Sequence, residues 1–156
     1  MKFSENGKEK LKLMEGFVPS TKKDMAGYPT IGYGHKIKPG ETFGVISEVV
    51  ATKIMMEDVA PYEGFINNYI GKRLTQNQFD ALVILMYNIG GTAFLNSSMF
   101  KEIKDGNFEE ATIPWAKWIN ITVKEKDPTT GLDIKKLIPV QGLINRRLQE
   151  INLFRG

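Results

Sequence analysis

Three polar side chains near the N-terminal end of the chain have types suited to cleaving a glycosidic bond: Glu15, Asp24 and Thr30. Glycoside hydrolysis commonly uses two carboxyl groups, one protonated to assist the leaving oxygen and one ionised. A hydroxyl group beside them could hold the attacking water. The residues alone do not decide, because the chain has 18 acidic residues. Glu15 could equally be a surface residue at a helix end, and Asp24 a turn residue.

The local pattern places these three residues on different elements. Residues 4–15 are predicted to form a helix that Ser4 caps and that stops at Gly16, which puts Glu15 at its end. Residues 17–46 are dense in proline and glycine, which favours a small antiparallel sheet with turns. Asp24 then lies in an irregular loop, and Thr30 begins a strand.

Residues 30–37 alternate as one strand would. The bulky members of the alternation share one face, which we expect to pack: Ile31, Tyr33, His35 and Ile37. The opposite face carries Thr30, Gly32 and Gly34 and is nearly bare backbone. Such a face leaves room for a ligand to approach.

The remainder of the chain is mainly helical in pattern. Helices are predicted at about 47–68, 75–89, 97–105, 108–119 and 141–154, and Pro61 either kinks or divides the first of them. Residues 121–139 interrupt this pattern around the turn signal of 127–131, and form either a hairpin or a mobile loop. The fold class is therefore α+β. We expect one domain over 1–156, with a β-rich lobe at about 16–46. A larger helical lobe takes 1–15 and 70–156, the helix at 47–68 joins the two, and a ligand binds between them.

Composition excludes several classes of protein. Hydrophobic residues make up 42% and charged residues 25%, which is typical of a globular protein and not of a disordered one. The absence of cysteine excludes disulfides, thiolate metal sites and cysteine nucleophiles. The net charge of +3 favours polyanionic partners without choosing among them. No apolar segment follows Met1 and Lys2, and no apolar run approaches the roughly 20 residues of a membrane span, so we expect synthesis and retention in a cytoplasm.

Four blocks of sequence resemble one known family. Glu15, eight residues, Asp24, five residues and Thr30, followed by Ile-Gly-Tyr-Gly-His at 31–35, is similar to the signature of phage-type lysozymes, glycoside hydrolase family 24. Further similarity lies at 74–82 continuing to 87–90, at 94–98, and at 142–147 with Glu150. These blocks span nearly the whole chain in the family's order.

The resemblance implies an enzyme with a lysozyme-like fold and no metal or organic cofactor. Its substrate would be peptidoglycan, cleaved at the β-1,4 bond between N-acetylmuramic acid and N-acetylglucosamine. Glu15 would be the general acid. Asp24 would orient or activate the water, or stabilise the charge that develops at the anomeric carbon, and Thr30 would help to hold the water. Asp24 as a covalent nucleophile is the alternative. Family members are generally inverting, which requires a carboxyl separation of roughly 6.5–9.5 Å. A lytic transglycosylase on the same fold, which forms an anhydro product, is the related alternative.

The resemblance also implies roles for other residues. His35 would form a structural ion pair with Asp58, which would raise its pKa. Four residues match positions near the cleft: Lys36, Tyr87, Asn88 and Ser97. The alternatives are core packing for Tyr87 and helix capping for Ser97. Arg146 or Arg147 would reach Glu15, unless both lie on the surface, and Trp115 and Trp118 are predicted as core anchors.

The expected partners follow from the residues themselves and from the family resemblance. Residues 135–156 carry five basic residues against one acidic residue, so a basic amphipathic helix could contact anionic membrane or lipopolysaccharide; an ordinary docked helix is the alternative. Nothing indicates nucleic-acid binding, and a monomer is expected. Residues 121–139 are longer than the matching connection in many family members. The resemblance further implies that a separate membrane pore, the holin, lets the enzyme reach the periplasm.

Overall fold

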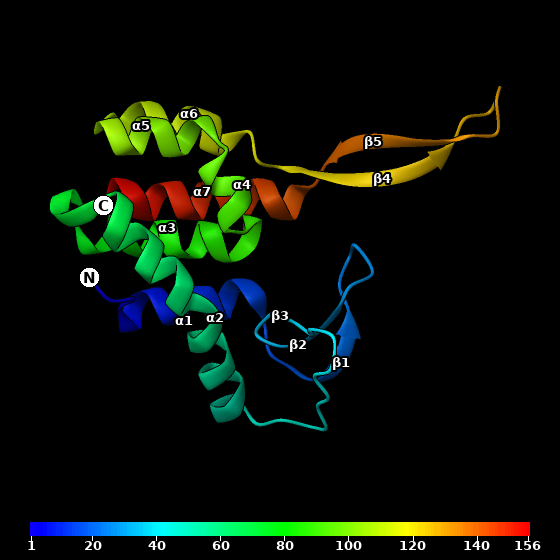
Figure 1. Ribbon diagram of the computed structural model, residues 1–156, viewed down its shortest axis with the longest axis horizontal. Helices are drawn as coiled ribbons and strands as arrows, with labels where there is room; N and C mark the ends of the chain where they lie inside the picture. Colours follow the sequence, from blue (N-terminus) through cyan, green and yellow to red (C-terminus); the bar gives the residue numbers. More distant parts are fainter.

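The computed structural model describes residues 1–156 and has an α+β fold, as predicted (Figure 1). Its elements, in chain order, are α1 (Glu5–Glu15), β1 (Val18–Lys23), β2 (Pro29–Gly32), β3 (His35–Lys36), α2 (Glu48–Tyr69), the 3-10 helix η1 (Gly71–Arg73), α3 (Gln76–Ile89), α4 (Gly91–Leu95), α5 (Ser98–Asp105), α6 (Phe108–Ala116), β4 (Asn120–Lys126), β5 (Asp133–Pro139) and α7 (Gln141–Arg155). The short elements η1 and α4 were not predicted. Both span fewer than two helical turns, which is too short for an apolar periodicity to show.

Helix α1 begins where its sequence predicts. The Ser4 side chain accepts a hydrogen bond from the N–H of Gly7, and Gly16, with a φ of 72°, follows the last residue. The chain before α1 is tied to buried carboxylates on other helices. The N–H of Ser4 donates to Asp80 of α3 at 3.1 Å, and the N–H of Phe3 donates to Glu63 of α2 at 2.6 Å. These contacts fix the helix whose last residue is Glu15.

The prediction of one strand over 30–37 was wrong. Strands β2 and β3 form a tight hairpin with the turn at Tyr33 and Gly34, and Ile31 pairs with His35. Gly32 and Gly34 have φ values of +66° and +77°, which alternation of side-chain types does not reveal. Gly32 is also not on an open face, because a Cβ added there would lie 3.1 Å from the Cβ of Ala51 in α2. Strand β1 completes the sheet in the order β1-β2-β3.

Helix α2 is one continuous helix of 22 residues, so Pro61 does not divide it. Ser47 caps its start by accepting from the N–H of Val50. The helix runs from beside the small sheet to the helical part of the molecule (Figure 1). It thus connects the sheet to the remaining helices.

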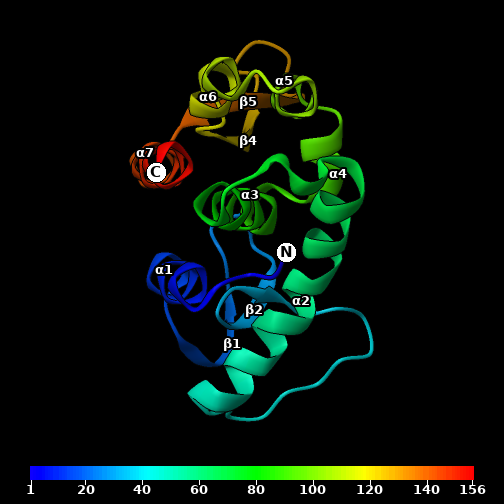
Figure 2. The ribbon, with the colours of Figure 1, turned by 90° about the vertical axis from the view of Figure 1, so that its left-hand side faces the viewer.

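Helix α3 is the centre of the core, and Figure 2 shows it end-on with α1, α2, α4 and α7 around it. The eight consecutive residues from Phe79 to Met86 are all buried. A helical segment buried on every side must be apolar on every side, and Phe79–Met86 meets this condition except at Asp80. Thr75 and Gln78 form the predicted capping box.

Residues 120–139 form the hairpin that was one of the two predicted forms. Strands β4 and β5 pair antiparallel without a bulge, from Asn120 with Pro139 to Lys126 with Asp133. The Asp127 side chain closes the turn by accepting from the N–H of Thr129 at 2.7 Å. Figure 1 shows this hairpin projecting well beyond the helices.

None of the helices combines the length and the apolar character needed to cross a membrane.

Candidate active site

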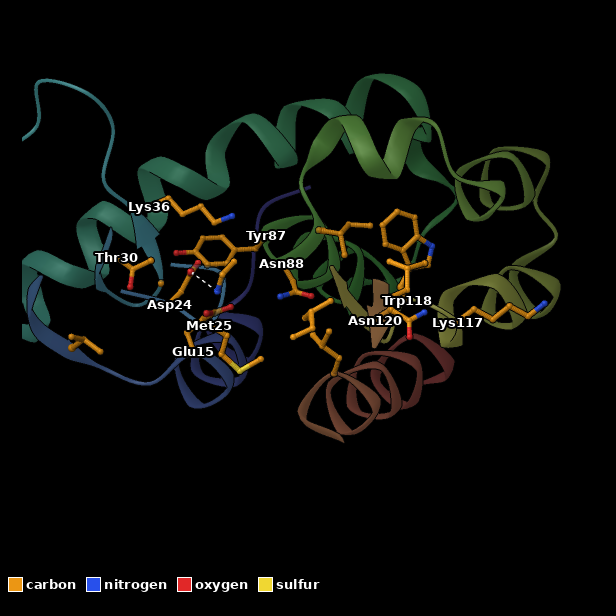
Figure 3. Close-up of a pocket in the computed structure, with 17 residues that line it drawn as sticks. Glu15, Asp24, Met25, Thr30, Lys36, Tyr87, Asn88, Lys117, Trp118 and Asn120 are labelled. Carbon is orange, nitrogen blue, oxygen red and sulfur yellow. Dashed lines mark hydrogen bonds between the residues drawn. The ribbon is translucent and has the colours of Figure 1, made fainter. Parts of the chain in front are cut away.

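A cavity of about 860 Å³ brings the three predicted catalytic residues together. Glu15, Asp24 and Thr30 lie in one part of it, and Figure 3 shows Trp118, Lys117 and Asn120 in the other part. The lining therefore comes from the end of α1, the sheet, the end of α3, the base of the β4–β5 hairpin and the start of α7. No group of three or more histidine, aspartate or glutamate side chains is placed to hold a metal ion.

The two oxygens of the Glu15 carboxyl group have different surroundings. Oε1 accepts a hydrogen bond from Nη1 of Arg146 at 2.6 Å, and Oε2 has no hydrogen-bond partner in the protein. Gly34 closes over this group, because a Cβ added there would lie only 2.5 Å from Oε2. The Glu15 side chain is 17% exposed. One oxygen is thus held by an arginine and the other is free to face a substrate.

Asp24 lies in the turn between β1 and β2. Its Oδ1 accepts from the N–H groups of Ala26 at 3.0 Å and Tyr28 at 2.8 Å, while Oδ2 makes no hydrogen bond within the protein. Aspartate side chains often stabilise turns in this way. The turn therefore holds the carboxylate by one oxygen and leaves the other available to a water in the cavity.

Thr30 joins the two long strands of the sheet. Its Oγ1 donates to the carbonyl oxygen of Lys22 at 3.1 Å, and these two residues are cross-strand partners. A hydroxyl group has one proton to donate and two lone pairs. With its proton used by the sheet, Thr30 can only accept a hydrogen bond from a water in the cavity.

A buried ionic cluster on α7 holds the arginine that reaches Glu15. Glu150 is fully buried and accepts hydrogen bonds from Trp115 Nε1 at 2.9 Å, Arg146 Nε at 3.1 Å and Arg147 Nη2 at 3.0 Å. Burial raises the pKa of the Glu150 carboxyl group, and the two guanidinium groups and the indole N–H act against that rise. Of the two arginines, Arg146 reaches Glu15.

Three of the four residues predicted near the cleft line the cavity. Lys36, Tyr87 and Asn88 line the cavity, whereas Ser97 does not. Ser97 is the N-cap of α5, accepts from the N–H of Phe100 and donates to the carbonyl of Phe94, so its capping alternative holds.

Both cleft residues of α3 are already engaged. The Tyr87 hydroxyl donates to the carbonyl oxygen of Tyr33 at 2.6 Å, and the Asn88 side-chain oxygen accepts from Arg147 Nη2. Burial raises the pKa of Tyr87, and the negative charge of Glu15 adds to that rise. Tyr87 is therefore a neutral hydrogen-bond donor that fixes the turn over Glu15.

His35 lies behind the site, buried between two carboxylates. Its Nδ1 is 2.6 Å from Asp58, the predicted partner, and its Nε2 is 2.9 Å from Glu41, which was not predicted. Burial acts to lower the pKa of His35, but the hydrogen bonds with Asp58 and Glu41 outweigh it and raise the pKa. His35 does not line the cavity that holds Glu15.

Comparison with known proteins identifies the family and the fold. Residues 12–150 match the family described as phage lysozyme. The chain belongs to this family. An endolysin of Acyrthosiphon pisum secondary endosymbiont phage 1 is 35% identical over 158 residues, which cover 100% of this chain and 99% of that protein. The endolysin of Salmonella phage P22 is 34% identical over 122 residues, covering 76% of this chain and 84% of that one.

Solved structures agree with the family assignment. The muramidase domain of SpmX from Asticaccaulis excentricus has a TM-score of 0.83 at 30% identity, covering 99% of this chain and 98% of that one. An endolysin from Escherichia coli O157:H7 phage FAHEc1 has a TM-score of 0.82 at 33% identity, covering 99% of this chain and 93% of that one. The chain is therefore a hydrolase of the lysozyme type that acts on peptidoglycan.

Relative to the sequence prediction, this phage lysozyme extends its cleft with residues that were not assigned to it. Trp118 was predicted as a core anchor and does pack against the core, but α6 ends at Ala116 and the half-buried Trp118 also lines the cavity. Trp115, in contrast, is fully buried as predicted. The hairpin adds Asn120, Ile121 and Leu137 to the cavity lining. The turn at 127–131 is the sequence feature that indicates a hairpin here, but it does not indicate that the base of the hairpin lies beside the site.

The structure does not contain the basic amphipathic helix that could have contacted an anionic membrane. Arg146 and Arg147 are buried and ion-paired with Glu150, and Lys135 and Lys136 belong to β5 instead of the helix. Helix α7 therefore has only Arg155 as an exposed basic residue. The alternative, an ordinary docked terminal helix, agrees with these contacts.

Proposed function

We propose that this phage lysozyme is an inverting muramidase in which Glu15 is the general acid. Glu15 would protonate the glycosidic oxygen as the bond to the anomeric carbon of N-acetylmuramic acid breaks. Water would attack that carbon from the opposite face and give its proton to Asp24. Both carboxyl groups present one unbonded oxygen in the same cavity, and this observation carries the proposal.

The neighbouring contacts suit these roles. Arg146 holds Oε1 of Glu15, which leaves Oε2 to donate the proton. Thr30, whose proton is used by the carbonyl of Lys22, would accept a hydrogen bond from the attacking water. This contact would orient the water together with Asp24.

Glu15→Gln tests the general acid, because it keeps the shape of the side chain and removes the transferable proton. We expect the rate of clearing of chloroform-treated Gram-negative cells to fall by about 10²–10⁴-fold. Glu57→Gln is the matched control, since Glu57 is exposed on α2 and outside the cavity. Equal clearing by Glu15→Gln and wild type would overturn the mechanism.

Product analysis tests the water-activating side of the proposal. A hydrolase leaves a reducing muramic acid, and inversion of the β bond gives the α-anomer first, which NMR can follow before mutarotation. An anhydro product would instead identify a transglycosylase. An initial β-anomer would indicate a covalent intermediate on Asp24.

We further propose, from the family resemblance, that the chain acts as a monomeric single domain and lyses the host at the end of a phage cycle. It would accumulate in the host cytoplasm and reach the wall through a separate holin. Expression in Escherichia coli with and without a co-expressed holin tests the route. Lysis at the same time in both cultures would contradict it.

A further inference from the structure

The wall of the catalytic cavity continues onto one face of the β4–β5 hairpin. Asn120 and Leu137 both line the cavity, and Ile121 completes the lining from the other face at the hairpin's base. Residues two apart in a strand share a face, and cross-strand partners share it too. Since Lys124 is paired with Lys135, this lysine pair lies on the face that carries Asn120 and Leu137.

The lysine pair has no partner of opposite charge in the protein. Neither Lys124 nor Lys135 forms an ion pair, whereas the next pair outward, Lys126 and Asp133, is joined at 2.7 Å. Like charges directly opposite each other destabilise an antiparallel pair. Both lysines are exposed, and the hairpin projects beyond the helices, so packing does not explain them (Figure 1). Two uncompensated positive charges therefore continue the line of the groove.

We propose that the face bearing Lys124 and Lys135 binds the free carboxylates of the acidic peptide stems that peptidoglycan carries on its muramic acid units. The inference rests on the proposed function, because only a polymer cleaved at Glu15 would extend from the cavity along the hairpin. A lysine ammonium group binds a carboxylate as a point charge, without a demand for planar geometry. Leu137, which is 66% exposed beside the pair, offers the apolar parts of a stem a surface.

An anionic membrane is the competing occupant, because Leu132 and Ile134 near the hairpin tip are also exposed. Continuity with the cavity favours the polymer. Asn120 and Leu137 join the catalytic groove to the lysine pair on one face, whereas Leu132 lies in the turn and Ile134 on the opposite face. The two occupants are separated by the experiment below.

The test combines Lys124→Gln/Lys135→Gln with two preparations of one peptidoglycan, one native and one with its stem carboxylates converted to amides by a carbodiimide and ammonia. We expect wild type to have a kcat/KM about three- to tenfold higher on the native preparation, the size expected for two exposed charge contacts. The double variant should cleave both preparations equally, at the rate of wild type on the amidated one. Lys53→Gln/Lys101→Gln changes the net charge identically at exposed positions outside the cavity and should behave as wild type.

Each result decides the proposal. Equal losses by the double variant on both preparations, or no loss on either, would overturn it. So would a variant whose only defect is weaker binding to vesicles containing phosphatidylglycerol, because the hairpin would then contact membrane. Failure of wild type to cleave either preparation would overturn the proposed function itself. Thermal unfolding of both double variants confirms that the exposed hairpin leaves the fold intact.

Discussion

Gly34 lies against the Glu15 carboxyl group, and Gly34→Ala tests whether the position of that group controls the rate. The added Cβ would lie 2.5 Å from Oε2 of Glu15. Ordinary contact begins near 3.4 Å, so the oxygen must move by roughly 1 Å. A misplacement of about 1 Å at a reacting group costs on the order of 10²-fold in rate. We therefore expect kcat to fall by about this factor in a folded protein.

Backbone strain adds a separate cost to the same substitution. Gly34 has a φ of +77°, where an alanine loses roughly 1–2 kcal/mol. For a chain of this size that corresponds to a fall in Tm of about 2–8 °C. Gly40→Ala is the matched control, because Gly40 has a φ of +87° with nothing within 4 Å of its added Cβ. It should lower Tm similarly and leave the rate unchanged.

The assay measures initial rates of clearing of chloroform-treated cells well below the Tm of both variants, with the folded fraction checked by circular dichroism. A folded Gly34→Ala protein with a rate near that of wild type would refute the reasoning, because Glu15 would then tolerate displacement. Equal rate losses in both variants would assign the effect to strain instead of to contact with Glu15.

Three further predictions concern the supporting contacts. The raised pKa of His35 means that the folded protein holds the imidazolium proton more tightly than the unfolded chain does. The stability gained from this proton is complete below about pH 6.5 and is lost as pH rises through the folded-state pKa. Urea unfolding of His35→Gln across this range should show no such loss of stability. Glu150→Gln leaves Arg147 without a carboxylate partner and Arg146 with Glu15 alone, and should lower the free energy of unfolding by about 3–5 kcal/mol in urea titrations. An unchanged midpoint would contradict the cluster. Tyr87→Phe removes the hydrogen bond to the carbonyl oxygen of Tyr33 and should lower the free energy of unfolding by about 1 kcal/mol. We expect little change in kcat/KM. A large rise in KM would instead show that the Tyr87 hydroxyl contacts substrate.

Local signals were sufficient to predict the elements that carry Glu15 and Asp24. The cap at Ser4 and the glycine after Glu15 define α1, and the proline and glycine content of 17–46 predicts turns such as the one around Asp24. These signals depend on hydrogen bonds and backbone angles within a few residues, so they can be read from the sequence without knowledge of the fold. The separation of the two carboxyl groups depends on tertiary packing and stays a prediction.

Other features of the site depend on information that residue types do not contain. Residues 30–37 alternate as a strand does, yet positive φ at two glycines folds them into a hairpin. Glu41 meets His35 across a loop that has no periodic pattern. Trp118 follows the apolar pattern of α6, but the helix ends at Ala116, and Trp118 lines the cavity as well as packing against the core. Each difference arose where glycine backbone angles, a contact made through an irregular loop or a helix end decided the outcome.

The pairing of Arg146 with Glu15 links the stability of the core to the geometry of catalysis. Arg146 and Arg147 lie four and three residues before Glu150, so both can pair with it on one side of α7. Their remaining nitrogens then diverge, and Arg146 reaches Glu15 while Arg147 reaches Asn88. Replacing buried ion pairs with apolar side chains is often neutral or stabilising in other proteins. Here the same replacement would remove the only hydrogen bond to the Glu15 carboxyl group, so the buried charge cluster orients the proposed proton donor, a role that stability alone does not require.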